Sequence, residues 1–366
     1  MMTFACRFCG ATDPWPFLDL GMMPSANDLV DPAEARPRPA YPLRTVVCRE
    51  CRLAQLDHTV DPGELFSDYV YFSSYSAGWV EHARRYAEAQ VEHLGLNGES
   101  LVVEIASNDG YLLRHFRDAG VPVLGVEPAA NVAETARAEG IPTDIRFFGV
   151  AAARALAAEG PRADLMAANN VLAHVPDIND FVAGFAVLLG EDGWISFEFP
   201  HLLRLLTDVQ FDTIYHEHYF YFSLHAVERI MAAHGLAVVD LEELPTHGGS
   251  LRLWVRHALH APAADTPATA RVRAAELEAG LETPEPYAAF AERCAALRQA
   301  LLEHIHASRA AGRRIAAYGA AAKGATLLNY CGLDAGDILF VADRNPVKQG
   351  RLMPGSRIPV VAPAHI

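Results

Sequence analysis

Apolar and polar positions alternate through the middle of the chain in a pattern that predicts strands and helices in turn. Residues 101–105 form a short apolar run rich in β-branched side chains, and residues 106–110 break it with polar and small residues. A helical stretch at 111–119 and a second apolar run ending at Glu127 follow. This order predicts a βαβ unit. Ligands bind at the carboxyl ends of the strands in an open parallel sheet, so the 106–110 loop and Glu127 should share that edge.

The same alternation continues to residue 257. It predicts helices near 131–138, 151–158 and 178–189, and strands near 143–147, 164–168, 194–199, 237–244 and 250–257. Only the short sequence Pro-Thr-His-Gly-Gly separates the last two strands. That connection is too short for a crossover helix, so these strands should pair antiparallel.

Residues 259–283 have the composition of a connector, and apolar positions three and four residues apart predict a long helix over 284–311. Cys294 lies on that stripe, which predicts a buried thiol. A strand, a small-residue loop and a helix start then predict a second Rossmann-like unit. Its loop carries Lys323 and either binds an anion at the helix N-terminus or is a tight turn with a solvated lysine. The chain stops where another element is due, so we expect this domain to be incomplete.

The formal net charge of -15 argues against nonspecific binding to nucleic acid or to anionic membranes, because both need a cationic face. A phosphorylated substrate would be held locally by a few Arg, Lys or backbone N–H groups. No apolar run approaches the roughly 20 residues of a membrane span, and the N-terminus has no signal-peptide pattern. We therefore expect a cytoplasmic protein with no membrane partner.

Four of the six cysteines form two C-x-x-C pairs, Cys6 with Cys9 and Cys48 with Cys51. Four thiolates of this kind bind a tetrahedral zinc ion, and the long segment between the pairs has several prolines and little periodicity, so a metal would stabilise it. The alternatives are metal-free turns or a redox role, although no thioredoxin-like pattern surrounds either pair. With four sulfur ligands the site would be closed and structural.

The 106–110 loop differs from a dinucleotide-binding loop. It has a single glycine, Gly110, rather than the G-x-G-x-x-G pattern that lets a pyrophosphate approach the backbone. Glu127, about 20 residues past the turn, can accept hydrogen bonds from both hydroxyls of a ribose. The pattern favours a nucleoside without phosphates, such as S-adenosylmethionine (SAM), although an α/β protein that binds neither ligand can carry it too.

Residues 210–223 carry the strongest chemical pattern, because Tyr215, His216, Glu217 and His218 are adjacent. Such a group can supply a general base, a residue that sets its tautomer and a donor to an oxyanion. A metal site and simple interface packing are the alternatives, and the H-E-x-x-H spacing of a zinc protease is absent. Residues 61–76, rich in tyrosine, either pack a domain joint or form a lid over the site.

The chain resembles the SAM-dependent C-methyltransferases that act on nucleotide-linked 4-keto-deoxysugars. The matching motifs are the four cysteines, YFSSYS at 71–76, EIASNDG at 104–110, GVEP at 125–128, NNVLAHVPD at 169–177, FDTIYHEHYFYFS, LPTHGGSLR and YGAAAKGATLLNYCG. The family's chains run on past the point where this one ends. The resemblance implies an α/β protein with a zinc-binding module (1–60), an aromatic lid and helix (61–98), a class I SAM methyltransferase core (99–258), a connector (259–283) and a C-terminal Rossmann-like domain (284–366).

The resemblance also implies roles for individual residues. His218 would remove the proton beside the ketone, Glu217 would orient His218, and Tyr215 would donate to the enolate oxygen or position the sugar. Tyr71 and His174 would assist as acid, base or positioning groups. The SAM site would comprise Glu104, Ala106, Asn108, Gly110, Glu127, Pro128 and Asn169, and the substrate would contact Tyr75, His216, His247, Gly248 and Lys323.

The expected substrate is a nucleotide-linked, dTDP-type 4-keto-deoxysugar methylated at C3 rather than C5, bound between the core and the C-terminal domain of a monomer. Two other functions fit parts of the pattern. An O- or N-methyltransferase would need no enolate, and a non-catalytic zinc-bearing interaction protein would not bind S-adenosylhomocysteine.

Overall fold

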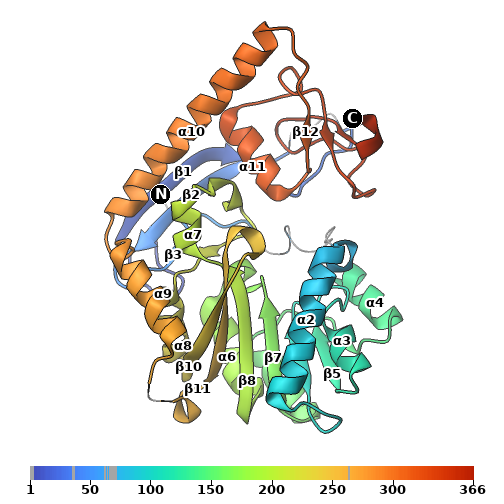
Figure 1. Ribbon diagram of the computed structural model, residues 1–366, viewed down its shortest axis with the longest axis vertical. Helices are drawn as coiled ribbons and strands as arrows, with labels where there is room; N and C mark the ends of the chain where they lie inside the picture. Colours follow the sequence, from blue (N-terminus) through green and yellow to red (C-terminus); the bar gives the residue numbers. More distant parts are fainter. Residues whose placement is uncertain (1–3, 35–37, 62, 64, 66–71, 263) are drawn as a thin grey trace.

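The computed structural model describes residues 4–34, 38–61, 63, 65, 72–262 and 264–366. Tyr71, which the resemblance places at the active site, lies outside these residues. Figure 1 shows the central sheet at the bottom and the C-terminal unit at the top. The long helix α10 (Glu285–Ala310) runs along one side between them, beside the N-terminal strands.

The central domain is built on one seven-stranded sheet in the order β10-β11-β8-β7-β4-β5-β6. The strands are β4 (Val102–Ile105), β5 (Val123–Val126), β6 (Thr143–Asp144), β7 (Ala163–Asn169), β8 (Leu189–Pro200), β10 (Leu236–Leu244) and β11 (Ser250–His257). β11 pairs antiparallel with both β8 and β10, as the short connection predicts, and the other pairs are parallel. The carboxyl ends of β4, β5, β7 and β8 therefore meet at one edge of the sheet.

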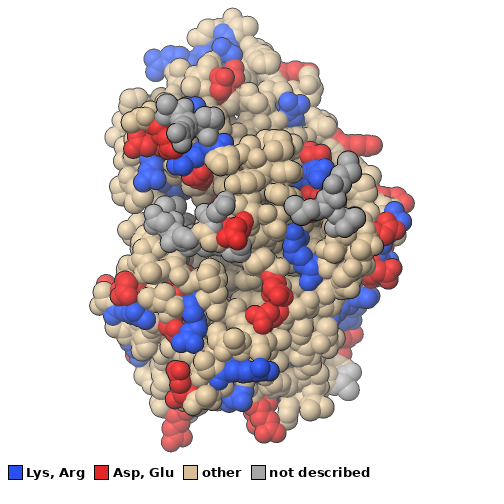
Figure 2. Space-filling view, turned by 180° about the vertical axis from the view of Figure 1, so that it is seen from behind, with Lys and Arg blue, Asp and Glu red and all other residues tan. Residues whose placement is uncertain are grey.

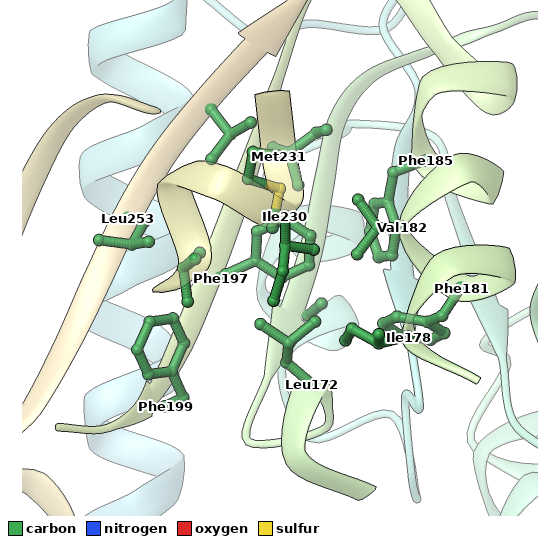
Figure 3. Close-up of a cluster of buried hydrophobic side chains, with 14 of the residues drawn as sticks. Leu172, Ile178, Phe181, Val182, Phe185, Phe197, Phe199, Ile230, Met231 and Leu253 are labelled. Atoms are coloured by element: carbon green, nitrogen blue, oxygen red, sulfur yellow. The ribbon is translucent and has the colours of Figure 1, made fainter. Parts of the chain in front are cut away.

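Helices cover both faces of this sheet. One face carries α2 (Ala77–Leu94), α3 (Leu113–Asp118) and α4 (Ala130–Ala138), and the other carries α5 (Val150–Glu159), α6 (Ile178–Leu188) and α8 (Leu224–Ala233). Figure 3 shows Phe181 and Phe185 on α6, Phe197 on β8 and Ile230 on α8 in one apolar cluster, and the ring centroids of Phe185 and Phe197 lie 4.8 Å apart. These side chains are buried, so the apolar faces of α6 and α8 pack against the sheet and fix the position of its strands.

The N-terminal module is a four-stranded antiparallel sheet, although the sequence shows little periodicity there. Its strands are β1 (Pro14–Met23), β2 (Tyr41–Cys48) and β3 (Ala54–Leu56), and the fourth is β9 (Phe220–Tyr221), supplied by the central domain. Register shifts within β1, between Pro16 and Leu18 and between Asp19 and Met22, disrupt the alternation of buried and exposed positions.

The C-terminal unit contains parallel strands β12 (Ala317–Tyr318), β13 (Val341–Ala342) and β14 (Val360–Val361) with helix α11 (Ala322–Cys331). The predicted strand, loop and helix start are thus confirmed. Helix α9 (Pro267–Glu278) lies in the predicted connector and α7 (Leu202–Thr207) follows β8. Cys294 is buried on α10, as its position on the apolar stripe predicts.

A segment of the N-terminal module, residues 24–34 (the N-terminal arm), reaches the C-terminal unit. Val30 forms an antiparallel bridge with Leu352, and Ala26 and Leu29 are buried in the apolar core of that unit. Residues far apart in the sequence are therefore brought together above the central sheet.

Cationic and anionic side chains are interspersed over the face in Figure 2. Of the helices in the described part of the chain, none combines the length and the apolar character that crossing a membrane requires.

Candidate active site

A cavity of about 410 Å³ lies at the carboxyl ends of the central strands. All three parts of the chain contribute to its wall. It brings together eleven residues that the sequence analysis assigns to the site: Ala106, Asn108, Glu127, Pro128, Asn169, His174, Tyr215, Glu217, His218, His247 and Lys323. The predicted cofactor loop and the predicted acid–base cluster thus face one enclosed space.

Glu127 lies at the end of β5 beside the loop that follows β4. Its carboxyl oxygens accept hydrogen bonds from the backbone N–H groups of Asn108 (2.9 Å) and Ala129 (2.9 Å). Burial raises the pKa of Glu127, and these backbone donors oppose the rise. Ala106 and Asn108 have positive φ angles, which fold the loop back toward the acid. The carboxylate is thereby fixed where a ribose would bind, which fits SAM.

Two predicted cofactor residues support this loop from below and are not among the described residues of the cavity wall. Glu104 is buried beneath the loop, and burial raises the pKa of its carboxyl group well above the usual range. Gly110 has a φ of 75°, and a Cβ atom there would approach the Ile141 side chain to 2.9 Å. Gly110 is therefore required by the turn rather than by the ligand.

Tyr215 and His218 form a hydrogen-bonded pair in the segment between η3 (Phe211–Thr213) and β9. The Nδ1 atom of His218 lies 2.9 Å from the carbonyl oxygen of Thr213. A carbonyl only accepts, so Nδ1 carries the proton and Nε2 accepts from the Tyr215 hydroxyl at 2.9 Å. Burial, followed by the neighbouring His174, lowers the pKa of His218 well below its usual range. The imidazole is therefore a neutral base with Nε2 unprotonated.

The expected orienting role of Glu217 is not what the geometry shows. The Thr213 carbonyl occupies that place on His218, while Oε1 of Glu217 accepts from the backbone N (3.3 Å) and Nδ2 (3.1 Å) of Asn27. Oε2 of Glu217 has no hydrogen-bond partner among the described residues, and the side chain is only 3% exposed. The oxygen is itself buried, in a residue that lines the cavity.

Three residues expected to contact substrate are not among those that line the cavity in the described structure. His216 is buried against Tyr41 of the N-terminal module, with ring centroids 5.9 Å apart. It lies in a turn that is closed by the hydrogen bond from the backbone N of His218 to the carbonyl oxygen of Tyr215 (2.9 Å). Tyr75 is 64% exposed and stacks on Phe72. Gly248 lines a separate surface hollow, where its carbonyl accepts from Gln210.

The aromatic stretch before α2 approaches the cofactor loop, as a lid would. In η1 (Ser73–Tyr75) the backbone N of Ser73 donates to Oδ1 of Asn108 (2.9 Å). The hydroxyl of Ser74 donates to Asp109 (2.5 Å). Ser73 itself lines the cavity. The end of the predicted lid or joint, residues 73 and 74, is thus hydrogen-bonded directly to the loop that follows β4.

Sequence reasoning missed several wall residues, including Asn27, Trp79, Asn170 and Lys348. Trp79 stacks on His82 and meets His247 edge-on, with ring centroids 4.9 and 5.4 Å apart. An aromatic residue at the start of the amphipathic helix was the available signal for Trp79. For Lys348, which comes from a turn of the C-terminal unit, the local sequence carries no comparable signal.

The four paired cysteines converge on one point. Their sulfur atoms all lie within 4.8 Å of one another, and Sγ–Sγ distances are 3.5 Å for Cys6 with Cys51 and for Cys9 with Cys48. Nε2 of Gln55 donates to the sulfur of Cys6 at 3.1 Å, as an outer contact to a thiolate ligand would. Four convergent thiols fit a tetrahedral zinc ion with no open position, so the ion is structural.

Comparison with known proteins agrees with this architecture. Family models match a zinc binding domain at residues 6–66, a methyltransferase domain at 79–241 and a C-methyltransferase C-terminal domain at 245–366. The C-methyltransferase NovU of Streptomyces niveus is 38% identical over 362 residues, which cover 98% of this chain and 85% of NovU.

Solved structures give weaker matches. A SAM-bound magnesium protoporphyrin IX methyltransferase from Synechocystis PCC 6803 is 15% identical and aligns with 54% of this chain and 98% of its own, with a TM-score of 0.39. The CcbJ methyltransferase from Streptomyces caelestis is 13% identical over 48% of this chain and 89% of its own, with a TM-score of 0.38. These scores are too low to support an argument about function.

The strand order, the four-cysteine cluster and the near full-length match to NovU lead to one assignment. The chain belongs to the family of SAM-dependent C-methyltransferases that carry an N-terminal zinc-binding domain and a dedicated C-terminal domain.

Proposed function

We propose that the protein methylates a nucleotide-linked 4-keto-deoxysugar at C3, one of the two carbons next to the ketone. The observation that carries this proposal is the neutral His218, whose Nε2 is hydrogen-bonded to Tyr215 in the same cavity as the Glu127 loop. An O- or N-methyltransferase acts on an atom that already has a lone pair. A carbon must first lose a proton, and an unprotonated imidazole supplies that step.

The proposed reaction follows from the pair's geometry. Nε2 of His218 accepts the proton from carbon, and the electron pair of that C–H bond moves onto the ketone as an enolate. For this step the Tyr215 hydroxyl turns from Nε2 to the ketone oxygen when the sugar binds, so the lone pair of Nε2 can take the proton while the hydroxyl donates to the enolate oxygen as it forms. Bound SAM supplies the electrophilic methyl group to which the carbon bonds. His174, whose ring centroid lies 4.7 Å from that of His218, lies where it can position the sugar.

The C-terminal unit supports a substrate with a diphosphate. Lys323 and Lys348 both line the cavity, and α11 begins at Ala322 with no side chain capping its N-terminus. Two cations and free helix N–H groups suit phosphate oxygens. This local positive charge favours anion binding by Lys323 over a solvated lysine in a protein whose net charge is -15.

The first test is mass spectrometry of a panel of 4-keto sugar nucleotides incubated with enzyme and SAM. His218→Ala should then abolish both methyl transfer and exchange of the hydrogen next to the ketone for solvent deuterium. Binding of S-adenosylhomocysteine, measured by calorimetry, should stay near normal. The exposed His93 provides a control, and His93→Ala should keep both activities. Exchange that persists in His218→Ala would mean that another group is the base.

A further inference from the structure

We propose that Asn27, from the N-terminal arm, is a positioning residue that holds the Glu217 carboxyl group so that its second oxygen faces the sugar. The inference rests on the proposed function, because it needs a sugar in the cavity. It assigns to the zinc-bearing module a direct part in recognition of the substrate.

The contact itself is specific. Both donors of Asn27, the backbone N and Nδ2, point to the same oxygen of Glu217, at 3.3 and 3.1 Å. Two donors on Oε1 fix the rotation of the carboxyl group. Oε2 is left buried without a partner among the described residues, which is costly unless a ligand supplies a donor.

Asn27 is held firmly from both sides. Ala26 and Leu29 are buried in the apolar core of the C-terminal unit, and Val30 exchanges backbone hydrogen bonds of 2.9 and 2.8 Å with Leu352. The arm is therefore fixed before any ligand binds. Preorganisation of this kind is what a positioning residue needs, since the ligand then does not have to order it.

The chemistry of Oε2 predicts a class of substituent. An acceptor oxygen in a buried wall selects a sugar position that carries a hydroxyl or an amino group, both of which can donate. It disfavours a deoxy position, because the oxygen would stay unpaired. Glu217 would thus act as a specificity determinant at a ring position near the reacting carbon.

The test uses two variants of the full chain, Asn27→Ala and Asn27→Asp. Asn27→Ala should lower kcat/KM for the sugar nucleotide by about 10- to 100-fold, the range for leaving a buried polar group without its partner, with KM for SAM unchanged. Asn27→Asp keeps the shape but places an acceptor against Glu217, so its loss should be larger.

Asn179 gives a matched control. Its Nδ2 also joins the core to the N-terminal module, by donating to the carbonyls of Arg7 (3.1 Å) and Phe8 (3.0 Å), away from the cavity wall. Asn179→Ala should keep wild-type kcat/KM. Wild-type kinetics in Asn27→Ala or in Asn27→Asp would overturn the inference alone. A wild-type enzyme that methylates no 4-keto sugar nucleotide would overturn the proposed function as well.

Discussion

The protonation state of His218 is set by contacts that a few neighbouring atoms make. The Thr213 carbonyl fixes the proton on Nδ1, and burial together with His174, His247 and Lys323 keeps the ring from gaining a second one. The neutral form of the proposed base is thus favoured by its surroundings and not by a partner carboxylate. That distinguishes it from a His–Asp pair, in which the acid favours the charged imidazole.

The lowered pKa of His218 should determine how kcat/KM changes at acid pH. In the proposed mechanism the neutral ring is the active form. A lowered pKa means that protonation of His218 begins at a lower pH than for an ordinary histidine, whose pKa is about 6.5. We expect kcat/KM for the sugar nucleotide to stay level as pH falls from 8 to about 6.5 and to decline only below that. A half-maximal point above pH 6.5 would contradict a lowered pKa of the base.

The sequence predicts which types of residue form the site better than it predicts which residues they contact in the fold. The cluster at 215–218 is visible as a motif, but only the fold shows that His218 faces the cavity while His216 packs on Tyr41. Asn27 lies 190 residues from Glu217 in the sequence, so no local pattern connects them. The partner of Glu217 was therefore inaccessible to motif reasoning.

Helix α2, which carries Trp79 to the cavity, is attached to the sheet by a buried ionic network. Glu198 of β8 is 0% exposed and accepts from Arg252 (2.7 Å) and Thr246 (3.0 Å), and it lies 3.0 Å from Nε2 of His82 on α2. Burial raises the pKa of Glu198, but its hydrogen bond with His82 and the charge of Arg252 bring it below the usual range. The charged form is thus the one built into the fold.

Removing the cation should destabilise the whole domain. Arg252→Met keeps most of the side chain's length but leaves a buried carboxylate without its main counter-charge, which costs roughly 3–5 kcal/mol. Urea unfolding measures the change. The control is Arg256→Met on the same strand, because Arg256 pairs with the exposed Asp192, and such pairs contribute about 0–1 kcal/mol. An equal decrease in the free energy of unfolding in both variants would show that burial of the Glu198–Arg252 pair is unimportant.

Elements with a regular pattern were predictable, and those completed by distant segments were not. The β10–β11 pair follows from its short connection and clear alternation, and α6 begins at Ile178 as expected. The N-terminal sheet was missed because β1 changes register and β9 has only two residues, Phe220 and Tyr221. Helix α3 begins at Leu113, two residues later than predicted, after the turn that needs Gly110.

At the scale of the whole molecule, the cavity is a meeting point of three parts. Asn27 comes from the N-terminal module, the loops after β4 and β5 from the core, and Lys323 and Lys348 from the C-terminal unit. The buried hydroxyl of Thr326 on α11 also donates to the carbonyl of Ile214, next to Tyr215. The four-cysteine zinc site lies in the module that positions Asn27, so loss of the zinc ion should lower the activity.

Cys9→Ser tests this connection, because Cys9 is the exposed member of the cluster and its replacement removes one of four thiolates. We expect the bound zinc to fall from one equivalent toward none, the melting temperature to drop by at least about 5 °C, and activity to fall with it. Elemental analysis and calorimetry measure the first two. Cys331→Ala, which lies outside the cluster, should keep the zinc. A variant at Cys9 that retains a full equivalent would contradict the four-sulfur site.

Strand β9 has a wider consequence. Its residues pair with β3. The segment that carries Tyr215 and His218 therefore joins the sheet of the zinc-bearing module at Phe220, two residues after His218. The pairing therefore couples the conformation of the N-terminal module to that of this central segment. A chimaera that exchanges the N-terminal module without the central segment would pair β3 with a strand β9 from another protein. A poor fit between those two strands would displace Tyr215 and His218.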